Sequence, residues 1–247
     1  MSRPVMIIGA TSGIGRAIAN AYASQGHALI LCGRDETLLK NTTQDIEIRF
    51  GVSATPLALD VLDFSRHQEI MQQAQALSSD PIEGVIMCHG IMPDQRQVFG
   101  NAEALHELID TNFASTVSLS EAAAALLSPN GGGFLCVVTS VAADRGRALN
   151  HLYGATKAAV TTYLEGLRVR LAADNIAVIN IKPGAIDTGM TWGMQGLPLI
   201  ASAERVARDT IRGVKRNRAV VYSPRIYSII MAVVRSIPDR VFKKMNF

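Results

Sequence analysis

Short apolar runs alternate along most of this chain with longer segments whose apolar residues recur at helical spacing. The runs have the length and composition of buried strands, and the longer segments have the period of amphipathic helices. The strand-like runs cover residues 5–8, 28–32, 55–59, 85–88, 134–139 and 177–181. The helical segments cover residues 14–25, 36–49, 65–77, 102–127 and 154–173. This order predicts an α/β fold, a doubly wound parallel sheet between two layers of helices (αβα), with residues 1–247 forming a single domain.

The alternation stops after residue 187. Residues 188–200 are rich in Gly, Met and Pro and contain the only tryptophan, Trp192. A loop near the carboxyl ends of strands is where a lid over a substrate would lie, so we predict a lid here. An ordinary flexible loop is the alternative.

The composition excludes a disordered chain, because 48% of the residues are hydrophobic. The three cysteines lie in separate apolar runs and form no C-x-x-C or Cys/His cluster. We therefore expect buried free thiols in a reducing compartment and no metal site. The sequence shows no secretion signal and no apolar stretch of the roughly 18 residues that a membrane span needs, which predicts a cytoplasmic protein.

Charge is distributed unevenly along the chain, whose net charge is +3. Residues 215–247 carry eight basic residues against one acid, Asp239, whereas the rest carries 16 basic and 20 acidic residues. The basic segment predicts an anionic partner such as a phosphate or a lipid surface, with a solvated helix as the alternative. Its nine-residue run 226–234 is too short to span a membrane but could lie in a membrane interface. We expect no nucleic-acid partner.

A glycine-rich turn, Gly9-Ala-Thr-Ser-Gly-Ile-Gly15, follows the first predicted strand. Glycines there allow a tight turn, so that backbone N–H groups and a helix amino terminus can approach a pyrophosphate. The spacing differs from the G-x-G-x-x-G fingerprint, so its position after the strand carries the prediction. The cofactor-binding residues predicted in the turn are Gly9, Thr11, Ser12, Gly13, Ile14 and Gly15.

The ends of the second and third strands bear on the choice of cofactor. The second strand ends at Gly33 and Arg34, where NAD-binding folds tend to place a carboxylate on the ribose 2′-hydroxyl. A guanidinium at Arg34 can instead bind a 2′-phosphate, which favours NADP(H), while the adjacent Asp35 keeps NAD(H) as the alternative. Asp60 and Val61 follow the third strand, where the carboxylate can accept a hydrogen bond from the adenine amino group.

Three residues in the middle of the chain predict the chemistry. Tyr153 and Lys157 are four apart and share one helical face. The ammonium favours the phenolate of a tyrosine whose ordinary pKa is near 10, so the phenol can exchange a proton near neutral pH. Ser140, at the end of the fifth strand, can donate a hydrogen bond to a developing oxyanion. The set predicts hydride transfer between a nicotinamide and a carbonyl or alcohol.

Together these residues resemble the short-chain dehydrogenase/reductase family, over nearly the whole chain. The resemblance implies a Rossmann fold and a homodimer or homotetramer. It implies that Tyr153 is the acid/base, Ser140 orients the carbonyl, Lys157 positions the ribose and lowers the tyrosine pKa, and Asn112 holds a water in a proton relay. The further cofactor-binding residues that it implies, besides Tyr153 and Lys157, are Gly90, Pro183, Gly184 and Thr188.

Two positions depart from the family pattern. Ile8 stands where the family usually has threonine, and the family's Asn-Asn-Ala-Gly segment is replaced by residues 87–90, Met-Cys-His-Gly. Only Gly90 is kept. We interpret His89 as a structural substitute at this strand end, not as a catalytic group.

The last third is similar to the decaprenylphosphoryl-2-keto-ribose reductases of this family, as is the run of residues 143–147, Ala-Asp-Arg-Gly-Arg, before Tyr153. The similar segments are 181–184, 188–190, 221–224, 235–238 and 241–244. The resemblance implies reduction of the 2-keto group of a polyprenyl-phosphate-linked pentose in cell-wall or glycan precursor synthesis, a flavin oxidase partner, and peripheral contact with the inner membrane face through 215–247. The alternatives are a reductase of another hydrophobic ketone or acyl substrate, a non-catalytic NADP(H)-binding sensor, and a non-enzymatic membrane adaptor.

Overall fold

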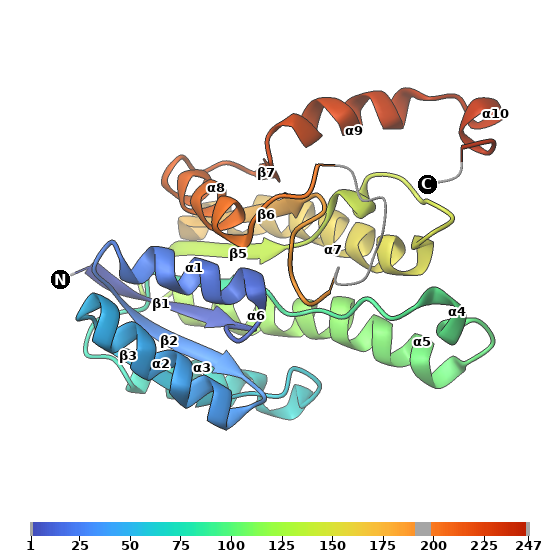
Figure 1. Cartoon of the computed structure of the whole chain (residues 1–247). Coiled ribbons are helices and arrows are strands. Elements are labelled where there is room, and N and C mark those ends of the chain that lie inside the picture. The colour runs from blue at the N-terminus through green and yellow to red at the C-terminus, as the bar shows by residue number, and fades with distance from the viewer. Residues whose placement is uncertain (1, 191–198, 246–247) are drawn as a thin grey trace.

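Seven parallel strands form one sheet in the computed structural model, which describes residues 2–190 and 199–245 (Figure 1). Across the sheet the strand order is β3-β2-β1-β4-β5-β6-β7. The strands are β1 (Ser2–Ile8), β2 (His27–Gly33), β3 (Ala54–Ala58), β4 (Gly84–Met87), β5 (Gly133–Val138), β6 (Ile176–Pro183) and β7 (Val220–Ser223). The order reverses between β1 and β4, which opens a crevice at the carboxyl ends of these strands. The predicted single-domain, doubly wound α/β fold is confirmed.

Helices cover both faces of the sheet, and each face has its own apolar core. One layer consists of α1 (Gly13–Ala23), α2 (Glu36–Phe50) and α8 (Ala203–Lys215). The other consists of α3 (His67–Ala76), α6 (Ser115–Leu127) and α7 (His151–Arg170). The shorter helices are α4 (Gln95–Val98), α5 (Ala102–Ile109), α9 (Ile226–Ser236) and α10 (Asp239–Phe242), with 3-10 turns at Phe64–Arg66, Val141–Ala143 and Leu171–Asp174.

The prediction that 102–127 forms one regular helix is wrong in its middle. A π-helical turn at Asp110–Ala114 separates α5 from α6. Its wider hydrogen-bond pattern inserts one extra residue into the helix and so changes the direction in which its side chains point. Asn112 lies in this turn.

The βα alternation also continues beyond residue 187, where the sequence analysis saw it stop. Helix α8 follows the predicted lid, and β7 adds a seventh parallel strand beside β6. The pattern was missed because α8 buries small residues such as Ala203, Ala207 and Gly213, and because β7 has only four residues. Residues 191–198 of the predicted lid, including Trp192, lie outside the described residues.

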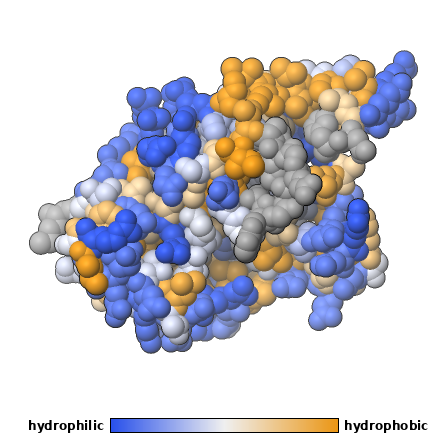
Figure 2. Space-filling view, in the orientation of Figure 1, coloured by the Kyte–Doolittle hydropathy of each residue, from blue (hydrophilic) through white to orange (hydrophobic). Residues whose placement is uncertain are grey.

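Helix α9 extends from the sheet as a separate element, at the top of Figure 1. Its inner side packs through Tyr227 and Met231 against Val141, forming a small third core. The fit is close at the end of β6, because a Cβ atom on Gly184 would lie 2.0 Å from the Tyr227 ring. The outer side of α9 is apolar and exposed (Figure 2). Within the described ranges, no helix has the length and apolar character that a membrane crossing needs.

Candidate active site

Two adjoining pockets lie along the carboxyl edge of the sheet, and His89 and Gly90 line both of them. Of the predicted residues, the first pocket is lined by Gly9, Thr11, Ser12, Arg34, Asp60 and Val61. The second is lined by Ile14, Ser140, Tyr153, Lys157, Pro183, Gly184 and Thr188. The fold thus brings together residues predicted for the cofactor and for the chemistry, from segments far apart in sequence. Gly13 and Gly15 lie in the first turn of α1, and Asn112 is fully buried with its Oδ1 next to Gly90.

The glycine turn packs so closely that its glycines leave no room for a Cβ atom. Gly9 has a φ of +78°, and a Cβ atom there would lie 2.8 Å from the backbone nitrogen of His89. A Cβ atom on Gly13 would lie 2.8 Å from a methyl carbon of Thr188. The Ser12 hydroxyl caps α1 by accepting from the Gly15 N–H at 3.0 Å. The turn therefore presents backbone and a helix amino terminus to the pocket, the arrangement that suits a pyrophosphate.

Arg34 was predicted to recognise a ribose 2′-substituent. It is exposed and lines the first pocket together with Asp60. Its guanidinium makes no hydrogen bond or ion pair with residues 2–190 or 199–245. The neighbouring carboxylate of Asp35 is already used, because it caps α2 by accepting from the Leu38 N–H at 2.8 Å. One oxygen of the adjacent carboxylate is thus engaged, while the Arg34 guanidinium has no partner among the described residues.

Tyr153 and Lys157 project from α7 into the second pocket, and both are buried. Burial raises the pKa of Tyr153 to about 12, while a hydrogen bond with Ser140 and the charge of Arg147 act in the opposite direction. The expectation that Lys157 brings this pKa towards neutrality is wrong for this structure, because desolvation of the phenolate dominates. Tyr153 is therefore a protonated phenol at neutral pH, as a proton donor must be.

Burial lowers the pKa of Lys157 to about 8. Its ammonium lies against Gly90, where an added Cβ atom would be 2.9 Å from Lys157 Nζ and 3.0 Å from Asn112 Oδ1. Only glycine fits between these two side chains. The ammonium therefore faces the junction of the two pockets, where a ribose hydroxyl would need a donor.

Asn112 is held rigidly by the backbone of Ile91. Its Oδ1 accepts from the Ile91 N–H at 2.8 Å, and its Nδ2 donates to the Ile91 carbonyl at 2.8 Å and to Thr156 Oγ1 at 3.1 Å. The π-helical turn places this amide between the loop after β4 and helix α7. These hydrogen bonds thus connect Thr156 on α7, the helix of Tyr153 and Lys157, to Ile91, which lines the first pocket.

His89 connects the end of β4 to α6. Its Nε2 lies 3.0 Å from Ser115 Oγ and 3.2 Å from Thr116 Oγ1. Burial, with a contribution from Lys157, lowers the pKa of His89 to about 3, so the ring is neutral. These contacts fit the structural role that the sequence analysis gave to His89.

Arg147 and Tyr227 line the second pocket, although the sequence analysis did not select them as site residues. Arg147 is half-buried, and its Nε atom is enclosed without a hydrogen-bond partner among the described residues. The available signal was an arginine between Ser140 and Tyr153, six residues before the tyrosine. Tyr227 could not be predicted, because its contact depends on where α9 packs.

The described ranges contain no group of three or more His, Cys, Asp or Glu side chains suited to a metal ion.

Comparison with known proteins places the chain among oxidoreductases. A family model described as short chain dehydrogenase matches residues 3–195. An uncharacterised oxidoreductase of Mycobacterium tuberculosis is 28% identical over 242 residues, covering 98% of this chain and 96% of the relative. A short-chain dehydrogenase of Sphingobium yanoikuyae in complex with NADPH has a TM-score of 0.79 at 24% identity, covering 96% of this chain and 97% of its own. An alcohol dehydrogenase of Thermococcus sibiricus with 5-hydroxy-NADP has a TM-score of 0.77 at 22% identity, covering 96% and 99%.

Proposed function

The chain belongs to the short-chain dehydrogenase family of oxidoreductases, and on that premise we propose that it is an NADP(H)-dependent carbonyl reductase. The observation that carries the proposal is the convergence of Ser140, Tyr153 and Lys157 on one cleft that adjoins the glycine turn. A non-catalytic NADP(H)-binding sensor would not need this set. A nicotinamide bound in the cleft would supply the hydride that goes to the carbonyl carbon.

The protein's own residues then donate the proton and stabilise the carbonyl oxygen. Tyr153, held protonated by burial, donates its phenolic proton to the carbonyl oxygen, which gives a secondary alcohol. Ser140 donates a hydrogen bond to the same oxygen as negative charge develops there. Lys157 binds the ribose hydroxyls, and Asn112 supports a water in the relay that returns a proton to Tyr153.

NADP(H) is the preferred cofactor because Arg34 is unpaired among the described residues and Asp35 is occupied as a helix cap. A guanidinium can bind a 2′-phosphate through two parallel hydrogen bonds, which NAD(H) does not offer. The two solved structures named above carry NADPH and 5-hydroxy-NADP, which is consistent with this preference.

For the substrate we propose a polyprenyl-phosphate-linked 2-keto-pentose, with another hydrophobic ketone or acyl substrate as the alternative. Arg147 supports an anionic substrate, because it is a cation in the cleft with no acidic residue among the described lining. Met190, Leu149 and Tyr227 supply apolar surface beside it for a lipid chain. A flavin oxidase acting on the corresponding alcohol would supply such a keto-sugar.

The proposal includes contact of residues 215–247 with a membrane that carries the substrate, at its inner face, and a homodimer or homotetramer. The basic residues of this segment and the exposed apolar side of α9 support the membrane contact. The non-enzymatic adaptor alternative predicts that vesicle binding survives loss of the glycine turn while no carbonyl is reduced.

The deciding experiment measures NADPH and NADH oxidation by the purified protein, with and without a polyprenyl-phosphoryl-2-keto-pentose. We expect turnover with NADPH, reduced at least about 100-fold in Tyr153→Phe, because a positioned acid contributes roughly 10²–10⁴ in rate. Tyr163→Phe, on the same helix, is the matched control and should keep its activity. NADPH binding without turnover of this sugar would contradict the substrate assignment and leave other lipophilic ketones to be tried.

A further inference from the structure

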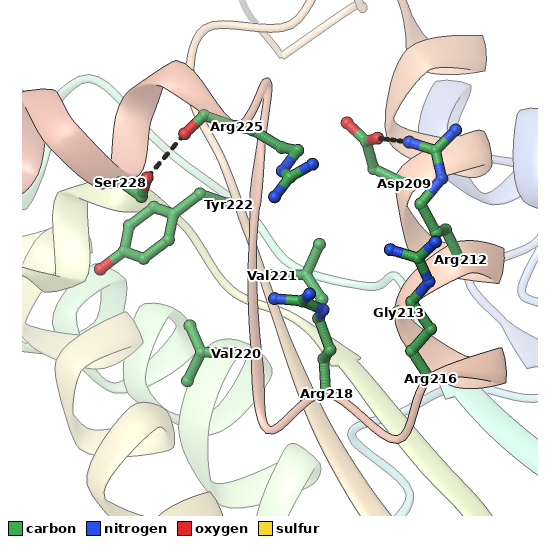
Figure 3. Close-up of a pocket in the computed structure, with 10 residues that line it drawn as sticks. All are labelled: Asp209, Arg212, Gly213, Arg216, Arg218, Val220, Val221, Tyr222, Arg225 and Ser228. Carbon is green, nitrogen blue, oxygen red and sulfur yellow. Dashed lines mark hydrogen bonds and ion pairs between the residues drawn. The ribbon is translucent and has the colours of Figure 1, made fainter.

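A further pocket, separate from the two pockets of the candidate active site, is surrounded by four arginines (Figure 3). Arg212 and Arg216 come from α8, Arg218 from the turn that follows it, and Arg225 from the start of α9. The floor of the pocket is formed by β7, including Val221. Three different parts of the chain thus direct guanidinium groups to one place.

The pocket has a large excess of positive charge. Its only acidic lining residue among those described is Asp209, which is buried and already shared. The Asp209 carboxylate accepts from Arg205 Nε at 3.0 Å, from Arg212 Nη1 at 3.3 Å and from Ser223 Oγ at 2.9 Å. Like charges held close together repel, so this arrangement favours a bound anion with several acceptor oxygens.

The three remaining guanidinium groups are available for that anion. Within residues 2–190 and 199–245, the side chains of Arg216, Arg218 and Arg225 make no ion pair or hydrogen bond. All three are exposed, so they can reorient towards a ligand. Arginine is suited to phosphate because its planar fork matches two phosphate oxygens.

The surface next to the pocket is apolar. Ile226, Ile229 and Val233 on the outer side of α9 are 47%, 63% and 60% exposed. Ile226 and Ile229 directly follow Arg225 and Ser228 of the pocket in sequence. Figure 2 shows this apolar band along the upper edge of the molecule, beside hydrophilic surface over α8. An exposed apolar helix face bordered by cations is the pattern of a helix that lies in a membrane interface.

We propose that the arginine pocket binds the phosphate of an anionic lipid headgroup while the outer side of α9 enters the membrane interface. The proposal deepens the membrane contact proposed above, and it needs no assumption about catalysis. Tyr227, on the inner side of the same helix, lines the active-site cleft. Headgroup binding would therefore hold the cleft close to the membrane from which a lipid-linked substrate is drawn.

The experiment is cosedimentation of the full chain, without cofactor or carbonyl, with vesicles of phosphatidylcholine alone or mixed with phosphatidylglycerol. We expect binding only to the mixed vesicles. The variant R216Q/R218Q/R225Q should bind about 100-fold more weakly, from roughly a fivefold contribution per basic residue near an anionic surface. The control R49Q/R96Q/R170Q removes the same charge from exposed arginines on α2, α4 and α7 and should bind nearly as the unmodified protein does.

Three results would overturn the proposal. Equal loss in the control variant would show a diffuse charge effect, and equal binding to neutral vesicles would show that no headgroup phosphate is recognised. If the protein binds inorganic phosphate in calorimetry but does not bind vesicles, and R216Q/R218Q/R225Q abolishes the phosphate binding, the pocket is a site for free phosphate.

Thermal unfolding checks that each variant is folded. The variant I229S/V233S should weaken vesicle binding while leaving the pocket intact. Because no turnover is measured, these results are independent of the proposed reductase activity.

Discussion

At the scale of single residues, Arg147 is the cleft residue that best tests the proposed anionic substrate. Its enclosed Nε lacks a partner among the described residues, and it lies in the same cleft as Tyr153. An enclosed donor without a hydrogen-bond partner is unfavourable, so an anionic group on the substrate would satisfy it.

We therefore predict that Arg147→Met raises KM for a phosphate-bearing keto-sugar by about 30-fold, from roughly 2 kcal/mol for a charge-assisted hydrogen bond. The same variant should lose much less activity with a small neutral ketone, because Tyr153 and Ser140 are kept and only the effect of Arg147 on the Tyr153 pKa is removed. Arg147→Lys should recover part of the loss. Steady-state kinetics with both substrates check this, and equal losses with both would mean that Arg147 acts on the fold and not on the substrate.

His89 should make stability dependent on pH. Its pKa is about 3 in the folded protein and near 6.5 in the unfolded chain, so below pH 6.5 the unfolded state takes up a proton that the folded state does not. Stability is then lost as the pH falls, by about 2 kcal/mol between pH 7.5 and 5. That loss corresponds to a decrease in Tm of about 4–8 °C for a chain of this size.

The variant His89→Ala should unfold at a lower temperature at pH 7.5, because the contacts with Ser115 and Thr116 are lost. Its Tm should nevertheless fall less between pH 7.5 and 5. Burial also lowers the pKa of His67, so part of the pH dependence remains in the variant. Thermal unfolding at the two pH values measures the difference, and an unchanged pH dependence would exclude His89 as its source.

At the scale of elements, the sequence predicts what its local patterns determine. The boundaries of the strands and the first helices were predicted to within two residues, except that β1 begins three residues earlier, because the apolar period is a local signal. The turn at Asn112 was not predicted, since the π-helical bulge depends on the hydrogen bonds with Ile91 across 21 residues. The position of Tyr227 in the cleft was not predicted either, because no local sequence pattern indicates where α9 packs.

Arg145 holds α9 in place from the loop that precedes α7. Its Nη1 donates to the carbonyls of Val234 and Ile237 at 2.6 and 2.5 Å, and its Nη2 pairs with Asp239 at 2.8 Å. Its guanidinium also stacks 3.8 Å from the Phe242 ring centroid. One side chain thus stabilises the carbonyl end of α9 and the start of α10.

We predict that Arg145→Gln loosens this region without unfolding the sheet. Loss of these charge-assisted hydrogen bonds, roughly 2 kcal/mol, should speed amide exchange across residues 226–242 about 30-fold. The substrate KM should rise, because α9 carries Tyr227 into the cleft. Hydrogen exchange with mass spectrometry measures the exchange rate across residues 226–242 and in the strands of the sheet. Arg170→Gln, which breaks the exposed pair with Glu121, is the control and should leave 226–242 unchanged.

At the scale of the whole molecule, we expect cofactor binding and folding to be coupled. The proposed cofactor site draws on β1, β2, β3, β4 and α7, so NADP(H) would bind only when the sheet is assembled. A ligand that binds only the folded state, at 100 times its Kd, stabilises it by about 2.7 kcal/mol. For a chain of this size that is an increase in Tm of about 5–10 °C.

The Tm should therefore rise more with NADPH than with NADH at the same concentration, by about 3–6 °C if Arg34 provides a tenfold preference. In Arg34→Ala the increase with NADPH should fall to the level seen with NADH, because the 2′-phosphate loses its cation. Arg49→Ala, an exposed arginine on α2, should keep the difference. A larger increase with NADH in the unmodified protein would instead assign the ribose contact to a carboxylate, with Asp35 or Asp60 as the residue to change next.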